Sequence, residues 1–153
     1  MQLRLVLLGG GNALGKALVR LGAEEDIAFL APKPEKGAWD AASLTSLIDE
    51  VRPDAVINLA YYYDWFQAGA VDPEHFVPQE RAVERLAQLC KHYDCVLLQP
   101  SSYRVFDGAR ATAYNETSEC QPLSPRGKAL MRMEQSVRAL CSKNILLCVG
   151  WLL

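Results

Sequence analysis

The chain has 153 residues, of which 50% are hydrophobic and 22% are charged, and its formal net charge is −2. This composition is typical of one globular domain with its own core, so we expect a single domain over residues 1–153. The small negative net charge does not indicate a basic surface that would bind nucleic acid, and no apolar run reaches the ~18 residues of a membrane span. We therefore expect neither nucleic acid nor a membrane as a partner.

The N-terminus has no basic region followed by a cleavage site, which favours a cytoplasmic protein. The cysteines show no metal-ligand spacing and their number is odd. We therefore expect no metal site and free thiols at Cys90, Cys95, Cys120, Cys141 and Cys148.

A strand-length apolar run over residues 5–8 meets a glycine-rich turn, and a helical pattern of Leu14, Leu18 and Leu21 follows. In a dinucleotide-binding unit the glycines let the backbone turn sharply and approach a pyrophosphate at the helix N-terminus. Asn12 stands at the middle glycine position of Gly-x-x-Gly-x-x-Gly, and we expect its side chain to obstruct a phosphate. A turn that binds nothing is the alternative. The expected cofactor-binding residues of the turn are Gly9, Gly10, Gly11, Asn12, Ala13, Leu14 and Gly15.

Residues 26–31 are predicted to form a short buried strand that ends at Pro32. An acidic residue at the tip of this strand would select NAD, whereas a basic residue nearby would admit the 2′-phosphate of NADP. The tip carries no acid and Lys33 follows it, so NADP is favoured and Lys33 is a candidate for its ribose end. A solvated loop lysine is the equally weighted alternative.

Asp40 is predicted to cap a helix whose apolar face continues to Val51, and residues 55–60 form a third buried strand. Five aromatic side chains then occur within residues 61–66. Ligands of open α/β sheets bind at the carboxyl ends of strands, so Ala60 and Tyr61 join the candidate cofactor-binding residues. Packing of a long loop, or contact with another subunit, is the alternative.

The rest of the chain predicts a helix over 78–93, a strand over 95–100, a loop over 103–123, a helix capped by Ser124 and a strand over 145–151. Buried strands that alternate with amphipathic helices predict a doubly wound parallel sheet of the Rossmann type. Two successive right-handed strand–helix–strand units lead us to expect the strand order 3-2-1-4-5.

Several stretches resemble the extended short-chain dehydrogenase/reductases, and among them the dTDP-4-dehydrorhamnose reductases. The resemblance rests on residues 9–15, 52–62 and 101–108, and on Tyr114-Asn115-Glu116, Pro122-Leu123, Gly127 and Glu134-Gln135. It implies an NAD(P)-binding domain and hydride transfer to a keto-sugar nucleotide, in which a serine or threonine, a tyrosine and a lysine four residues after the tyrosine take part.

Carried over residue by residue, the resemblance puts Ser102 at the serine/threonine position, Arg126 at the tyrosine and Leu130 at the lysine. A guanidinium stays charged near neutral pH and cannot donate the proton, and Leu130 offers nothing to a ribose hydroxyl. The resemblance therefore implies that no catalytic set is intact. We expect NADP binding to be weak, with no cofactor binding as the alternative.

Members of this family continue into a C-terminal substrate lobe, which is expected to be absent from this chain, so the chain is either a fragment or a stand-alone domain. Three functions follow. The first is a catalytically degenerate nucleotide-binding or regulatory module, with the family's regulatory β subunit of methionine adenosyltransferase as a precedent. The second is an active NADP-dependent sugar-nucleotide reductase or epimerase with relocated catalytic residues. The third is a cofactor-free interaction module. The expected partners are a nucleotide or sugar nucleotide, another protein, or a second copy.

Overall fold

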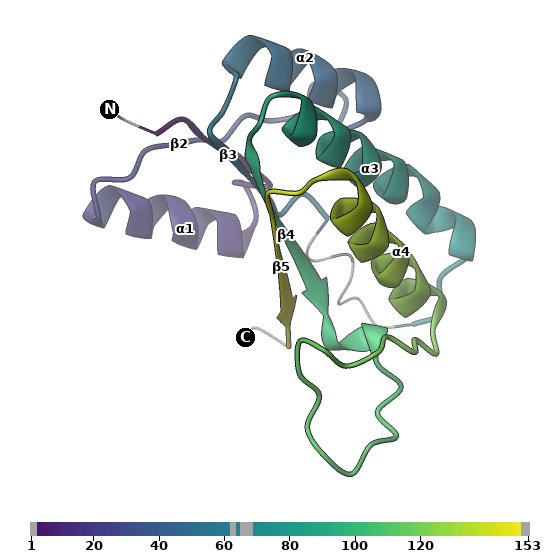
Figure 1. Cartoon of the computed structure of the whole chain (residues 1–153). Helices are drawn as coiled ribbons and strands as arrows, with labels where there is room; N and C mark the ends of the chain where they lie inside the picture. Colours follow the sequence, from purple (N-terminus) through teal and green to yellow (C-terminus); the bar gives the residue numbers. More distant parts are fainter. Residues whose placement is uncertain (1–2, 62–63, 65–68, 151–153) are drawn as a thin grey trace.

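The computed structural model describes residues 3–61, 64 and 69–150. Five parallel strands form one sheet in the order β2-β1-β3-β4-β5, and Figure 1 shows α1 on one side of it and α2, α3 and α4 on the other. The predicted doubly wound α/β class is therefore confirmed. The elements are β1 Leu5–Leu8, α1 Ala13–Glu24, β2 Phe29–Leu30, α2 Ala41–Val51, β3 Ala55–Asn58, α3 Val77–His92, β4 Val96–Ser102, α4 Pro125–Leu140 and β5 Asn144–Val149, with short 3-10 turns η2 Pro73–Phe76 and η3 Tyr103–Val105.

The predicted strand order 3-2-1-4-5 is wrong, because β3 pairs directly with β1 and not with β2. The predicted order requires both right-handed crossovers to step in the same direction along the sheet. In the structure α1 and α2 cover opposite faces of the sheet, so the same handedness carries the chain back past β1 to its other edge. This reversal makes the carboxyl ends of β1 and β3 the switch point of the sheet, where open α/β sheets bind ligands.

The second strand is also shorter and less buried than expected, because the predicted range 26–31 contains only Phe29–Leu30 as strand. Asp26 has a positive φ of 61°, which turns the chain before the strand, and Ile27 and Leu30 are 44% and 48% exposed. The prediction placed this strand inside the sheet, whereas β2 lies at its edge.

The starts of the later helices follow the predicted capping residues. The Asp40 carboxylate accepts from the backbone N–H of Ser43 at 2.8 Å, while the Ser43 hydroxyl reaches back to the N–H of Asp40, which completes a capping box for α2. The Ser124 hydroxyl accepts from the N–H of Gly127, and Pro125 occupies the first helical position of α4.

The core lies on both faces of the sheet. Its strand residues are almost inaccessible to solvent, and the inner faces of α2, α3 and α4 pack on one side of them, while Leu14 and Leu18 of α1 pack against the core from the other side. The contributors from strands and helices include Val6, Leu7, Leu8, Val56, Leu97, Leu44, Ile48, Val83, Leu86, Ala129, Leu130, Met133 and Val137. Strand β4 continues two residues past its predicted end at residue 100, so Ser101 and Ser102 belong to the strand.

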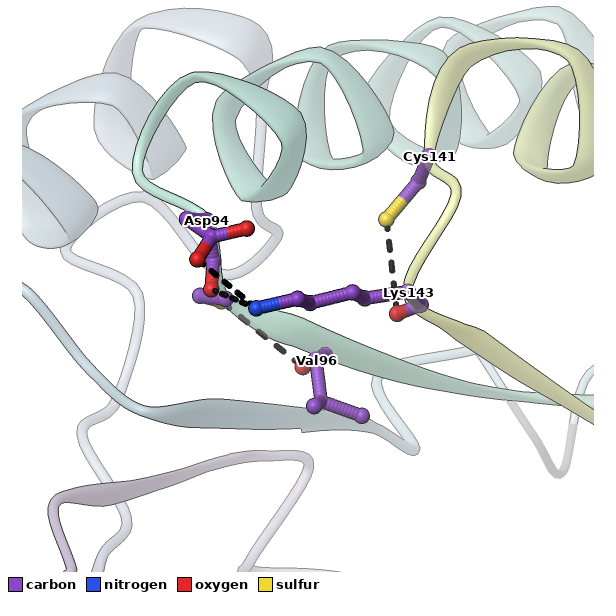
Figure 2. Close-up of polar contacts among 5 residues, drawn as sticks. Asp94, Val96, Cys141 and Lys143 are labelled. Atoms are coloured by element: carbon purple, nitrogen blue, oxygen red, sulfur yellow. Dashed lines mark hydrogen bonds and ion pairs between the residues drawn. The ribbon is translucent and has the colours of Figure 1, made fainter.

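The amino ends of β4 and β5 are held together by polar contacts (Figure 2). The Lys143 ammonium donates to the carboxylate of Asp94 at 2.7 Å and to its backbone carbonyl at 3.4 Å. The Lys143 carbonyl accepts from the backbone N–H of Leu97 at 2.9 Å and from the thiol of Cys141. All five cysteines have free thiols, as predicted, and Cys148 is exposed.

Candidate functional site

The sheet topology brings three predicted groups of residues to one edge. The glycine turn follows β1, Ala60 and Tyr61 follow β3, and Ser102 ends β4. Because these strands are parallel neighbours in the order β1-β3-β4, their carboxyl ends lie side by side.

Gly9 and Gly15 allow the turn to lie against its neighbours. Gly9 has φ +84°, and a Cβ there would stand 2.5 Å from the carbonyl oxygen of Leu59. A Cβ on Gly15 would stand 2.2 Å from the carbonyl oxygen of Gly9, so helix α1 can start directly beside the end of β1 only with glycine at this position. Both glycines therefore have a close packing role in addition to any ligand.

The Asn12 side chain makes two hydrogen bonds at the glycine turn. Its Oδ1 accepts from the N–H of Gly15 at 2.8 Å and caps α1, while its Nδ2 donates to the carbonyl of Leu59 at 3.0 Å. The side chain thus takes one of the N–H groups at the start of α1. The N–H groups of Ala13 and Leu14, in the first helical positions, have no acceptor within the helix and are the donors left for a phosphate.

The surroundings of the other two glycines differ. A Cβ on Gly10 would meet the Cβ of Ala31 at 2.7 Å, so the turn lies close to the tip of β2. A Cβ on Gly11 would have no atom within 4 Å, and Gly11 is exposed. Lys33, two residues beyond Ala31, is exposed as well, so its predicted contact with a ribose phosphate stays a prediction.

Tyr61 is held at the end of β3 by its hydroxyl, which donates to the backbone carbonyl of Trp39 just before α2. Burial, and then the negative charge of Asp40, raise the pKa of Tyr61 to about 12. Its phenol therefore stays protonated and acts as a structural donor. Of the aromatic stretch predicted over residues 61–66, Tyr62, Tyr63, Trp65 and Phe66 lie outside the described residues.

Arg126 and Leu130 lie on the buried face of α4, one turn apart. Arg126 is 5% exposed and Leu130 is 1% exposed. The Leu130 side chain is part of the core. The Arg126 guanidinium lies over the ring of Phe76 at 5.7 Å, and burial, followed by the positive charge of Arg104, lowers the pKa of Arg126. The position that the resemblance assigns to a ribose-binding lysine is thus occupied by an apolar side chain that packs inward.

Two further tyrosines lie near Ser102 in the chain. The Tyr114 hydroxyl donates to the carboxylate of Asp107 at 2.6 Å, and its ring stacks on Phe106. Tyr103 is 47% exposed, and the guanidinium of Arg104 lies 5.7 Å from its ring centre. The Ser102 hydroxyl accepts from the N–H of Arg104 at 3.3 Å and caps η3.

Sequence reasoning missed Arg104 and Ser101. The side-chain Nε of Arg104 and the hydroxyl of Ser101 are buried without a hydrogen-bond partner, as are Nε and Nη2 of Arg126. It also missed Asp64, whose carboxylate contacts the side chains of His75 and Gln79. An arginine two residues after a Ser-Ser pair at a strand end was the available signal for Arg104.

Across residues 3–61, 64 and 69–150, no three His, Cys, Asp or Glu side chains are grouped so that they could hold a metal ion. None of the helices in these ranges is both long and apolar enough to cross a membrane.

Residues 3–153 match the family described as RmlD substrate binding domain. The chain belongs to this family. Among curated relatives, the dTDP-4-dehydrorhamnose reductase of Aggregatibacter actinomycetemcomitans is 30% identical over 152 residues, which cover 97% of this chain and 51% of the relative. The corresponding enzyme of Mycobacterium tuberculosis is 28% identical over 153 residues, again 97% of this chain and 50% of the relative. The chain therefore spans about half the length of the curated relatives it matches.

Solved structures of other proteins share the fold. The dTDP-4-dehydrorhamnose reductase of Bacillus anthracis, in complex with NADP, superposes with a TM-score of 0.84 at 21% identity over 100% of this chain and 55% of that one. The Bordetella bronchiseptica enzyme WbmG, in complex with NAD and UDP, gives a TM-score of 0.73 at 15% identity, over 97% of this chain and 53% of that one. The relationship to dTDP-4-dehydrorhamnose reductases expected from the motifs is confirmed, and with it an NAD(P)-binding type of fold.

Proposed function

We propose that this RmlD-family chain is a catalytically degenerate NAD(P)-binding-type domain that serves as a nucleotide-binding or regulatory module. The observation that carries the proposal is the burial of Arg126 and Leu130 in α4, at the two positions that the resemblance assigns to the tyrosine and the lysine. Carbonyl reduction needs a proton as the hydride arrives, and a positioned acid contributes about 10²–10⁴-fold. A buried guanidinium and a core leucine supply neither the proton nor a ribose contact.

The glycine turn supports the nucleotide part of the proposal. It lies at the switch point of the sheet, and the N–H groups of Ala13 and Leu14 remain available to a pyrophosphate. The Bacillus anthracis relative carries NADP. We expect NADP(H) to bind with its phosphates over Gly10–Leu14 and its ribose end near Lys33. The binding is weak, because Asn12 takes the N–H of Gly15 and Leu130 replaces a ribose-binding lysine.

The proposal is tested by mixing the chain with NADPH and a panel of 4-keto sugar nucleotides and following the nicotinamide absorbance. The same assay is run on any longer natural protein that contains the chain, because its relatives are about twice as long. We expect NADPH to be oxidised no faster with the chain than in the same mixture without protein. The control variant Ser102→Ala should give the same background rate. Steady turnover would overturn the assignment.

The second candidate is an active reductase with a relocated acid, and one observation favours it. Tyr103 directly follows Ser102 and exposes 47% of its surface, whereas the Tyr114 hydroxyl is engaged by Asp107. If the assay shows turnover, Tyr103→Phe should abolish it and Tyr114→Phe should not. The third candidate is a cofactor-free interaction module, and assays that show neither turnover nor dinucleotide binding would favour it.

A further inference from the structure

All the buried side-chain nitrogen and oxygen atoms that lack a hydrogen-bond partner in the described part of the chain belong to three residues. They are the Ser101 hydroxyl, Nε of Arg104, and Nε and Nη2 of Arg126. Ser101 is the last residue but one of β4, Arg104 lies in η3 directly after this strand, and Arg126 lies in the first turn of α4. Buried donors are normally paired, so unpaired donors gathered at one strand end need an explanation.

The three residues are held close by the backbone. A Cβ on Gly127 would stand 2.2 Å from the carbonyl oxygen of Arg104, so the first turn of α4 packs directly on η3. Ser101 shares its face of β4 with Leu97 and Gln99, which are buried under the helices, because side chains alternate along a strand. Arg126 belongs to the α4 face that covers this side of the sheet.

The charges at this place do not balance. Arg104 lies near enough to Arg126 for its charge to lower the pKa of Arg126, which burial lowers further, and Asp64 is the acidic group that acts in the opposite direction. The Asp64 carboxylate is engaged by His75 and Gln79. An arginine that is only 5% exposed and lies beside a second cation costs free energy unless an anion pairs with it.

A cavity of about 410 Å³ lies beside η3. Arg104, Asp107 and Ser124 line it together with the aromatic side chains of Tyr103, Phe106 and Tyr114, whereas Ser101 and Arg126 lie behind Arg104 and do not line it. The Asp107 carboxylate is engaged by the Tyr114 hydroxyl, which leaves Arg104 as the cation that faces the cavity. This volume is in the range of small-molecule sites. Arginine pairs are suited to carboxylate and phosphate oxygens because their N–H groups form a planar fork.

We propose that Arg104, backed by the buried Arg126 and the hydroxyl of Ser101, forms a binding site for the carboxylate or phosphate group of a small molecule that occupies this cavity. The site is separate from the glycine turn and does not depend on dinucleotide binding. It assigns a ligand-binding role to the arginine that stands at the family's tyrosine position.

The test is thermal unfolding of the chain with inorganic phosphate or with malonate, each against chloride at the same ionic strength. A specific anion stabilises the folded state saturably, and we expect Tm to rise by roughly 3–6 °C at about ten times the dissociation constant. The two anions separate phosphate from carboxylate recognition. The absence of a saturable rise with both anions would overturn the proposal.

Matched variants locate the effect. Arg126→Met should unfold at a higher temperature than the parent in chloride, because it removes an unpaired buried charge, and should lose the anion-dependent rise. Arg132→Met removes an arginine of the same helix that is paired with Glu80 on the surface, and should keep the rise. Arg104→Met, at the partly exposed arginine, should also lose it and serves if Arg126→Met does not fold. A rise that persists in both Arg104→Met and Arg126→Met would refute the site.

Gly11→Val separates this site from the glycine turn. It should keep the anion-dependent rise even where it removes NADPH binding. If Gly11→Val abolishes the rise, the anion is bound at the glycine turn and the arginine site is refuted, while the proposed dinucleotide function is untouched.

Discussion

The side-chain amide of Asn12 donates to the backbone carbonyl of Leu59 over 3.0 Å and ties the glycine turn to the end of β3. The same side chain caps α1 through the N–H of Gly15. Asn12 was expected to obstruct a phosphate by its size. The geometry gives a different physical reason for weak binding, because the side chain removes a donor from the helix N-terminus.

Replacing Asn12 should therefore change stability and affinity in opposite directions. Asn12→Gly loses the cap and the tether, and we expect the free energy of unfolding to fall by about 1 kcal/mol. It returns the N–H of Gly15 to the ligand, so NADPH should bind about 2- to 10-fold more tightly. Denaturant unfolding and calorimetric titration measure the two effects. Unchanged affinity would show that the cap is not what limits binding.

Gly9 and Gly11 form a matched pair in one turn. Gly9→Ala requires a side chain at φ +84° and 2.5 Å from the carbonyl of Leu59, so we expect a loss of at least about 2 kcal/mol in unfolding free energy. Gly11→Ala places its methyl group in open space and should change that free energy by less than about 0.5 kcal/mol. Urea unfolding of both variants checks the prediction, and similar losses for the two would contradict the described turn.

Leu130 is expected to act as a core residue. Leu130→Ala should lower the unfolding free energy by about 2–5 kcal/mol, because it removes a side chain that is 99% buried and leaves a cavity. Leu123→Ala is the control, since Leu123 is 75% exposed and should cost less than about 0.5 kcal/mol. A small effect at Leu130 would mean that this face of α4 borders an open cleft, as a lysine position would require.

Asp107 provides a prediction about pH. The hydrogen bond from the Tyr114 hydroxyl, and then that from the N–H of Ala109, lower the pKa of Asp107. A lowered folded-state pKa stabilises the fold above the ordinary pKa of the group, and this stabilisation is lost as pH falls through the folded-state value. Tyr114→Phe should raise the pKa of Asp107 and leave Asp54, which is held by Arg4, unchanged. Carboxyl carbon NMR titration measures both groups, and an unshifted Asp107 would contradict the contact.

Local signals in the sequence predicted most of the elements well. Asp40, Ser124 and Pro125 mark the starts of α2 and α4, because their side chains or ring suit the first turn of a helix. The strand order was not predictable in the same way. It depends on which face of the sheet α2 covers, and the apolar pattern of α2 is the same for either face.

In the candidate site, too, the features that depend on local sequence were predicted and those that depend on tertiary packing were not. The glycine turn was found from residues 9–15 because its requirements are local backbone requirements. The cluster of Ser101, Arg104 and Arg126 was not found, because an arginine in a sequence is normally read as exposed. Its burial results from the packing of α4 on η3, which brings together residues that are more than 20 positions apart.

Calorimetric titration of NADPH into the chain, alongside Gly11→Val, tests the proposed nucleotide-binding function most directly. The account predicts weak, saturable binding by the parent chain and its loss in Gly11→Val, whose side chain extends from the turn into open space without disturbing the packing of Gly9 and Gly15. No heat at millimolar NADPH, or equal binding by the two proteins, would contradict a dinucleotide site at this turn.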